Sequence, residues 1–201
     1  DATSKNDLET VGNAQISTAQ SKSGGSSILL AQSGTNDYLH SPDSQLWQLT
    51  GDFTLEAWIY PTSLSGTNGN VICSQWPGGT ASNQCFQFLV NSTGKVSLVY
   101  GIGATNAAVT GTSQSATTNN WNHVAVSREG STVRFFVNGN LDTTTGTVSG
   151  ALNNSTGMLS VGRINATDLG YFTGYIDDLR ITNGFARYTA SFTPQSPFPT
   201  Q

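Results

Sequence analysis

The sequence predicts an all-β protein built from antiparallel strands. Short runs rich in Val, Ile, Phe, Tyr, Trp and Thr recur along the chain, and Gly, Asn, Ser and Pro separate them. Helical periodicity is almost absent, and several runs alternate apolar and polar residues, which is typical of strands with one buried face. These observations predict a sandwich or a barrel. Because all-β chains of roughly 200 residues commonly fold as one unit, we expect residues 1–201 to form a single, complete domain with no internal linker.

The strands can be placed from these runs and from the turns between them. In residues 53–59 alternate apolar residues starting at Phe53 should share the buried face, and Thr54, Glu56 and Trp58 should share the other. Asn138-Gly139 predicts a tight hairpin turn, because both residues tolerate a positive φ. The expected strands cover residues 27–31, 37–40, 53–60, 71–75, 86–91, 96–101, 122–128, 132–138, 158–162 and 174–182.

The charge pattern excludes some classes of function. The eight Lys and Arg residues are scattered and the net charge is −4, so the chain has no basic patch for nucleic acid. No apolar run approaches the ~18 residues of a membrane span. Only 10% of residues are charged, and the polar residues are mainly Ser, Thr, Asn, Gln and Gly. This composition favours an extracellular or virion-surface location, for a mature product or an excised domain.

The chain has two cysteines, Cys73 and Cys85, each in or beside an expected strand. Pro77, Gly78 and Gly79 lie between them and indicate a turn. The two thiols could therefore face each other across a hairpin and form a disulfide, which needs Cα atoms within about 7 Å. The alternative is a pair of free, buried thiols that pack as small apolar side chains.

Four motifs suggest a family. They are SGTNDYL at 33–39, GDFTLEAWIYP at 51–61, WNHVAV at 121–126 with FFVNG at 135–139, and GYIDDLRI at 174–181. In this order and spacing, together with the entry segment 1–6, they resemble the laminin-G-like, concanavalin-A-like lectin and glucanase superfamily over essentially the whole chain. The ending FARY at 185–188 and FTP at 192–194 is similar to versions in bacteriophage and marine-virus structural proteins.

The resemblance implies an antiparallel two-sheet jelly-roll sandwich and a mostly non-catalytic module that binds carbohydrate or protein. It often implies a structural calcium ion near the rim, for which Asp37 and Asp177 are the candidate ligands. If Leu179 and Ile181 face the core, alternation places Asp177 on the same side, where a carboxylate needs a partner or a metal. The segment 30–33 departs from the family pattern, because many members carry an Asp there.

The spacing of the carboxylates argues against an enzyme. Glycoside hydrolases need two carboxylates that flank the scissile bond, and in this fold they usually alternate along one strand. The three glutamates, Glu9, Glu56 and Glu129, each lack an acidic residue two positions away. No hydrolase elbow, zinc-protease or phosphate-loop motif occurs either. We therefore expect no catalysis, and we interpret His123 as a packed or hydrogen-bonded histidine within a sheet.

Sugar binding would need exposed aromatic rings. Trp76, in a Pro-Gly-Gly loop, is the first candidate, followed by Tyr171 and Tyr100. The alternative is that each ring folds over an end of the sandwich as a hydrophobic lid, while Trp58 and Trp121 belong to the core or a sheet face.

The sequence thus predicts a non-catalytic structural or adhesion module on the exterior of a virion or cell. Its expected partners are other virion or surface proteins, further copies of itself, and glycans. The alternative is a calcium-dependent carbohydrate-binding module of a secreted protein.

Overall fold

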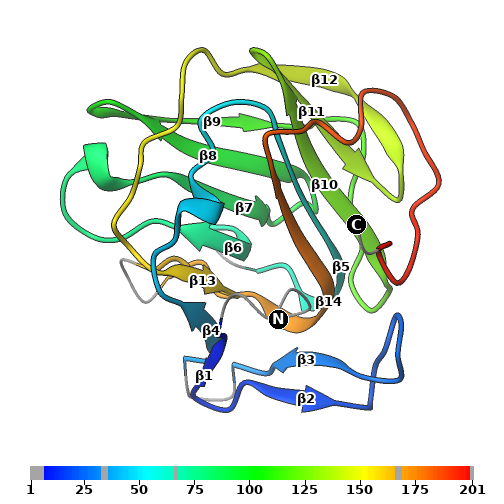
Figure 1. Cartoon of the computed structure of the whole chain (residues 1–201). Coiled ribbons are helices and arrows are strands. Elements are labelled where there is room, and N and C mark those ends of the chain that lie inside the picture. The colour runs from blue at the N-terminus through cyan, green and yellow to red at the C-terminus, as the bar shows by residue number, and fades with distance from the viewer. Residues whose placement is uncertain (1–6, 33–35, 66–67, 166–168, 200–201) are drawn as a thin grey trace.

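The computed structural model describes residues 7–32, 36–65, 68–165 and 169–199 as two packed antiparallel sheets (Figure 1). Sheet A has seven strands in the order β1-β4-β13-β6-β7-β8-β9, and sheet B has seven in the order β12-β11-β10-β5-β14-β3-β2. The predicted two-sheet jelly-roll sandwich is therefore confirmed. The entry segment 1–6 and residues 33–35 of the first motif lie outside the described residues.

All ten predicted strands are present, and four further strands were not predicted. The bounds are β1 Glu9–Val11, β2 Gln15–Ser17, β3 Ser27–Leu30, β4 Tyr38–Ser41, β5 Phe53–Ser63, β6 Asn70–Gln75, β7 Phe86–Val90, β8 Val96–Ile102, β9 Thr105–Thr110, β10 Asn122–Glu129, β11 Thr132–Val137, β12 Asn140–Thr147, β13 Leu159–Val161 and β14 Thr173–Asn183. The short 3-10 helices η1 (Gln45–Trp47) and η2 (Ala81–Asn83) complete the regular structure of the described residues. The unpredicted strands, β1, β2, β9 and β12, are the edges of the two sheets.

The core lies between the sheets and is formed by alternate residues of the central strands. Phe53 and Leu55 of β5 are fully buried, as are Phe86 and Phe88 of β7 from the other sheet. Each of these side chains removes enough apolar surface from water to contribute roughly 1.5–3 kcal/mol. On β5 the alternation leaves Thr54, Glu56, Trp58 and Tyr60 on the outer face of sheet B.

The predicted turn at Asn138-Gly139 joins β11 to β12. Asn138 has φ 52° and Gly139 has φ 76°, so both residues adopt the positive φ that this turn requires. The turn also touches the end of the chain, since the backbone N–H of Phe192 donates to the carbonyl of Gly139 at 2.9 Å. A Cβ on Gly139 would lie 2.0 Å from the Phe192 carbonyl oxygen, so the close approach requires glycine.

The predicted disulfide is wrong, because Cys73 and Cys85 are free, buried thiols. Cys73 pairs with Phe88 across the β6–β7 ladder, whereas Cys85 donates its backbone N–H to Gln75. Phe88 is three residues beyond Cys85, and at about 3.3 Å per strand residue this offset exceeds the reach of a disulfide. The alternative interpretation, two packed apolar thiols, is confirmed.

The predicted inward direction of Asp177 is also wrong. Asp177 pairs with Trp58, and both side chains lie on the outer face of sheet B. The register then shifts between Asp177 and Arg180, with Asp178 at φ 50° inside the bulge. The extra residue reverses the alternation, so Leu179 and Ile181 pack against the core although Asp177 faces outward.

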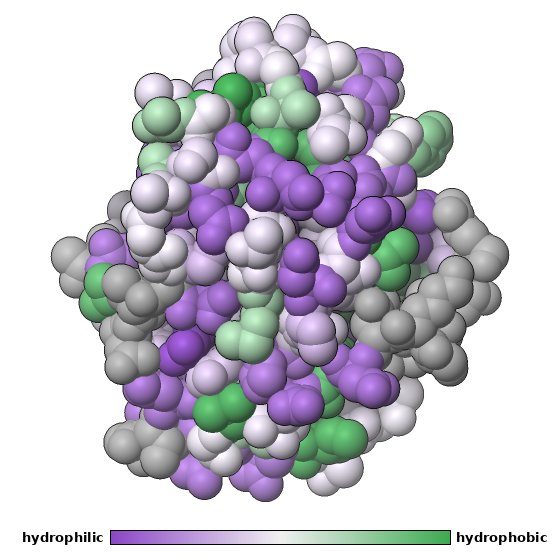
Figure 2. Space-filling model, turned by 60° about the vertical axis from the view of Figure 1, so that its left-hand side comes forward, coloured by the Kyte–Doolittle hydropathy of each residue, from purple (hydrophilic) through white to green (hydrophobic). Residues whose placement is uncertain are grey.

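The surface agrees with the low-charge composition. Figure 2 shows a face on which hydrophilic and near-neutral residues dominate and the hydrophobic ones form small, separate patches. Within the described part of the chain, no helix is long and apolar enough to span a membrane.

Candidate functional site

The first predicted sugar-binding residue, Trp76, is not an exposed platform. Its side chain is only 8% exposed and packs with Val71, Leu89 and Ile164. These residues form a second hydrophobic cluster on the outer face of sheet A. The prediction that Trp76 lies exposed in its loop is therefore wrong, and the alternative of a covering, packed ring describes it.

The other two predicted aromatics are also partly buried. Tyr100 packs against the core. Its hydroxyl donates to the carbonyl of Thr147 at 3.5 Å, so Tyr100 connects β8 of sheet A to β12 of sheet B. Tyr171 lies partly buried just before β14. The structure does not bring Trp76, Tyr100 and Tyr171 into one site.

The predicted calcium ligands lie at opposite ends of β3. Asp37 is fully buried and accepts backbone N–H groups from Asn13 at 2.7 Å and from Gln32, just beyond the end of β3, at 2.9 Å. Asp177 accepts the backbone N–H groups of Lys22 and Ser23, before the start of β3, each at 3.1 Å. Each carboxylate thus accepts backbone N–H groups at its own end of β3, and the two do not converge on one metal position. No group of three or more His, Cys, Asp or Glu side chains suited to a metal occurs in the described ranges.

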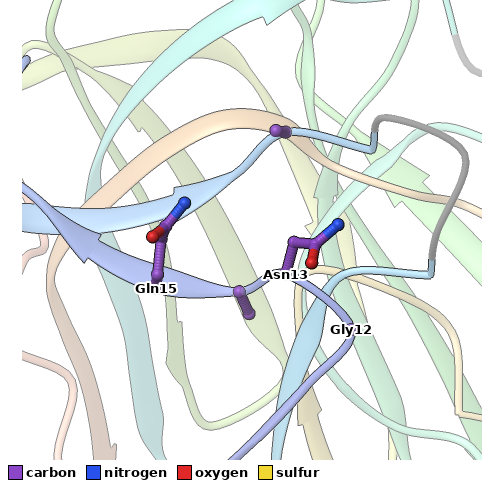
Figure 3. Close-up of a pocket in the computed structure, with 5 residues that line it drawn as sticks. Gly12, Asn13 and Gln15 are labelled. Atoms are coloured by element: carbon purple, nitrogen blue, oxygen red, sulfur yellow. The ribbon is translucent and has the colours of Figure 1, made fainter.

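A surface hollow of about 420 Å³ lies beside Asp37 and is lined by Gly12, Asn13, Ala14, Gln15 and Ala31. Figure 3 shows the amide side chains of Asn13 and Gln15 at this hollow. A Cβ on Gly12 would lie 2.6 Å from an oxygen of Asp37, so the turn packs tightly over the carboxylate. The hollow is small and polar, and its wall carries no exposed aromatic ring.

The outer face of sheet B carries a denser set of functional side chains. One half of this face is covered by the C-terminal segment, residues 184–199, which leaves the end of β14 and crosses to the outer side of β10 and β11 (Figure 1). The indole N–H of Trp58 donates to the carbonyl of Gln195 at 3.0 Å, and Arg187 donates its backbone N–H to Thr54 at 2.9 Å. The segment therefore covers β5 from Thr54 to Trp58.

Beneath this segment lies a cluster centred on Glu56, whose side chain is fully buried. One oxygen of Glu56 accepts Arg180 at 2.8 Å, and the other lies 3.1 Å from His123 Nε2 and 2.8 Å from the Tyr188 hydroxyl. Burial alone would raise the pKa of Glu56, but the His123 hydrogen bond, the Arg180 charge and the Tyr188 hydrogen bond together hold this pKa below its usual value. Burial and the Glu56 charge raise the pKa of Tyr188 to about 12.

These four residues, the Glu56 cluster, fasten the C-terminal segment to sheet B. Their carboxylate is ionised and sealed from solvent, which suits a structural role and not proton transfer to a substrate. The interpretation of His123 as a packed, hydrogen-bonded sheet histidine is confirmed.

The other half of the same face, which the described C-terminal segment does not cross, holds three neighbouring aromatic rings. Tyr60 of β5 pairs with Tyr175 of β14, and Trp121 precedes Asn122, which pairs with Ile59. The ring centroids of Trp121 and Tyr175 lie 5.7 and 5.8 Å from that of Tyr60. All three rings are partly exposed. We call Tyr60, Trp121 and Tyr175 the aromatic row.

Charged groups border the aromatic row. Trp58 lies next to Tyr60 on the same face of β5. The Lys22 ammonium lies 3.9 Å from the centre of the Trp58 ring. The Asp177 carboxylate lies across the ladder from Trp58. The site therefore combines apolar ring surface with one cation and one carboxylate, which can bind a ligand that has both apolar faces and hydroxyl groups.

The sequence contained the signal for this row. Period-two alternation already placed Trp58 on the outer face, and one further step along β5 reaches Tyr60. The pairing of Tyr175 with Tyr60 could not be read from the pattern. Trp121, which the sequence predicts in the core or on a sheet face, lies on the outer face of sheet B against Tyr60.

The fold is a concanavalin A-like jelly-roll sandwich. The chain belongs to the concanavalin A-like lectin/glucanases superfamily, whose family model matches residues 33–187. No curated protein sequence matches the chain.

Several solved structures share the fold. Domain 4 of AbnA, an extracellular arabinanase from Geobacillus stearothermophilus solved with arabinotriose, has a TM-score of 0.63 and 21% identity over 88% of this chain and 82% of its own. The binding domain of Paraclostridial Mosquitocidal Protein 1 has a TM-score of 0.64 and 14% identity over 94% of this chain and 45% of its own. The enzymatically active domain of tailspike protein 2 of bacteriophage CBA120 has a TM-score of 0.61 and 15% identity over 88% of this chain and 28% of its own. This chain thus spans less than half of the latter two, and at these identities the likeness establishes the fold alone.

Proposed function

We propose that the protein is a non-catalytic glycan-binding module on the exterior of a virion or cell, and that the aromatic row on sheet B is its binding site. The observation that carries this proposal is the clustering of Tyr60, Trp121 and Tyr175, all partly exposed, on the outer face of sheet B. Sugar rings present apolar C–H faces that pack on aromatic rings and hydroxyls that need polar partners. Asp177 and Lys22 supply such partners beside the row.

The ring orientations favour a soluble oligosaccharide as the ligand over the flat surface of a crystalline polysaccharide. The planes of Trp121 and Tyr175 are turned by 63° and 83° from that of Tyr60. A crystalline surface would contact coplanar rings, whereas turned rings suit a single oligosaccharide whose units rotate along the chain. We therefore infer a short, soluble glycan as the ligand.

The carboxylates support a binding function and not hydrolysis. Glu56 lies buried under the C-terminal segment, Glu9 pairs with His40 at 3.3 Å, and Glu129 pairs with Arg134 at 3.2 Å. Among the described residues, Asp177 is the carboxylate beside the aromatic row, and glycoside hydrolysis needs two.

The general likeness to an arabinanase domain, a toxin binding domain and a phage tailspike domain also fits a recognition module outside the cell. In this proposal other surface or virion proteins, or further copies of the chain, would be its structural partners.

The alternative proposal is binding that depends on calcium held through Asp37 or Asp177. The N–H groups that these carboxylates accept weigh against it, and the aromatic row requires no metal. Chelation of calcium separates the two proposals. It should leave binding at the aromatic row unchanged, whereas it should abolish calcium-dependent binding.

A glycan array tests the proposal. The wild-type protein should bind a set of soluble oligosaccharides equally with calcium and with chelator. Trp121→Ala should lose at least about tenfold in affinity, because an aromatic ring that anchors a binding site commonly contributes this much. The matched control is Tyr38→Ala, since Tyr38 lies on sheet A with Arg163 3.8 Å over its ring. An array without hits, or equal losses in both variants, would refute the proposal.

A further inference from the structure

A second pocket lies between the C-terminal segment and sheet B. Its volume is about 290 Å³, close to the lower end of the range for small-molecule sites. It is lined by Arg180, Phe185, Arg187, Tyr188, Phe192, Thr193, Gln195, Phe198 and Pro199. All of these except Arg180 belong to the C-terminal segment, so the pocket exists only because that segment folds onto the sheet.

The two arginines of the pocket are used differently. Arg180 lies 2.8 Å from Glu56 through both Nε and Nη2, and its Nη1 donates to the carbonyl of Pro199 at 3.2 Å. Arg187 donates through Nε to Thr182 at 2.6 Å and lies 3.9 Å from Glu56. Neither Nη of Arg187 has a hydrogen-bond acceptor among the described residues.

Arg187 is held less closely by a carboxylate than Arg180 is. The single carboxylate of Glu56 faces two guanidinium groups, and Arg180 holds it more closely. Another carboxylate, Asp178, accepts the backbone N–H of Phe198 at 3.1 Å and acts on Arg180. Burial and repulsion from Arg180 lower the pKa of Arg187 against the attraction of Glu56.

Aromatic rings line the same pocket. Tyr188 and Phe192 stack with their centroids 3.6 Å apart and their planes within 2°. Phe185 is 59% exposed and lines the pocket. Apolar rings beside a guanidinium whose Nη groups have no acceptor in the described residues suit a ligand that carries an anionic group on an apolar-faced ring.

We propose that this pocket binds the carboxylate of an acidic sugar residue, with Arg187 as the group that pairs with it. The planar Nη fork of arginine matches the two oxygens of a planar carboxylate. One guanidinium with both Nη groups available matches one carboxylate, whereas a phosphate group would bring up to two charges. This site is separate from the aromatic row and does not rest on its function.

Glucuronate and glucose are the matched probes, because they differ only in a carboxylate in place of a hydroxymethyl group. In an NMR titration of the full chain, glucuronate should bind at least about tenfold more tightly than glucose, since charge-assisted hydrogen bonds contribute this much. Arg187→Gln should remove the difference. Arg134→Gln, which deletes a surface arginine paired with Glu129 elsewhere on sheet B, should retain it.

Two further arms make the result decisive. Phe185→Ala, a change at an exposed ring, should weaken glucuronate binding while the melting temperature stays unchanged, so the test does not depend on the stability of Arg187→Gln. Trp121→Ala should leave the preference for glucuronate over glucose intact, which separates this site from the aromatic row. Equal binding of glucose and glucuronate, equal binding of inorganic phosphate, or an unchanged preference in Arg187→Gln would overturn the proposal.

Discussion

Replacement of Glu56 by glutamine should reveal how strongly the C-terminal segment is held. The change keeps the side-chain shape but removes the charge that faces Arg180, whose side chain is 16% exposed. Loss of one partner from a buried ion pair costs about 3–5 kcal/mol, because the remaining charge is left uncompensated. For a domain of this size, each kcal/mol lowers the melting temperature by roughly 2–4 °C. We therefore expect Glu56→Gln to melt about 6–20 °C below the wild type.

Thermal and urea unfolding followed by circular dichroism would measure this effect. The matched control is Glu129→Gln, which removes the same charge from a pair in which Glu129 is 53% exposed, and which should cost at most about 1 kcal/mol. Limited proteolysis should also release the C-terminal segment sooner in Glu56→Gln. If both variants unfold within about 1 kcal/mol of the wild type, the Glu56 cluster does not fasten the segment.

Three further outcomes are expected. The pKa of Asp142 is lowered, since four backbone N–H groups outweigh the opposing effect of its burial, and the pKa of Glu56 is lowered as well. Their stabilisation is therefore complete above the unfolded pKa values near 4 and is lost as the pH falls through the folded ones, so urea unfolding should show lower stability at pH 3 than at pH 7. Cys73 and Cys85 should react with a thiol reagent only after unfolding, because burial raises both pKa values, that of Cys85 to about 12; rapid labelling of the native protein would contradict this. Gly139→Ala should destabilise the protein by more than about 1 kcal/mol, because a Cβ would meet the C-terminal segment, and an unchanged melting curve would be evidence against that contact.

The sequence predicted the inner strands and missed the edges for a physical reason. Inner strands such as β5 and β10 are buried on one face by the core and carry regular apolar residues. β9 (Thr105–Thr110) is mostly exposed, and β12 (Asn140–Thr147) contains Asp142 and Gly146, residue types that are depleted in strands. Edge strands gain their pairing from a neighbour that sequence patterns do not identify.

The site was harder to predict than the fold. Trp76 follows a strand and precedes Pro77, which suggested an exposed loop, but a hydrophobic cluster on the outer face of sheet A covers it. The disulfide prediction failed because it depended on the register of β6 and β7, which places Phe88 and not Cys85 opposite Cys73. The direction of Asp177 failed because the bulge adds a residue that alternation does not anticipate.

The indole N–H resonances of the four tryptophans provide the most direct test of the aromatic row. Trp121 lies in the row and Trp58 beside it, whereas Trp47 belongs to the core and Trp76 lies on the other sheet. On titration with a soluble oligosaccharide that the array identifies, the Trp121 resonance should shift most, with a smaller change at Trp58 and none at Trp47. A titration in which Trp76 shifts while Trp121 does not would contradict the location of the binding site on sheet B.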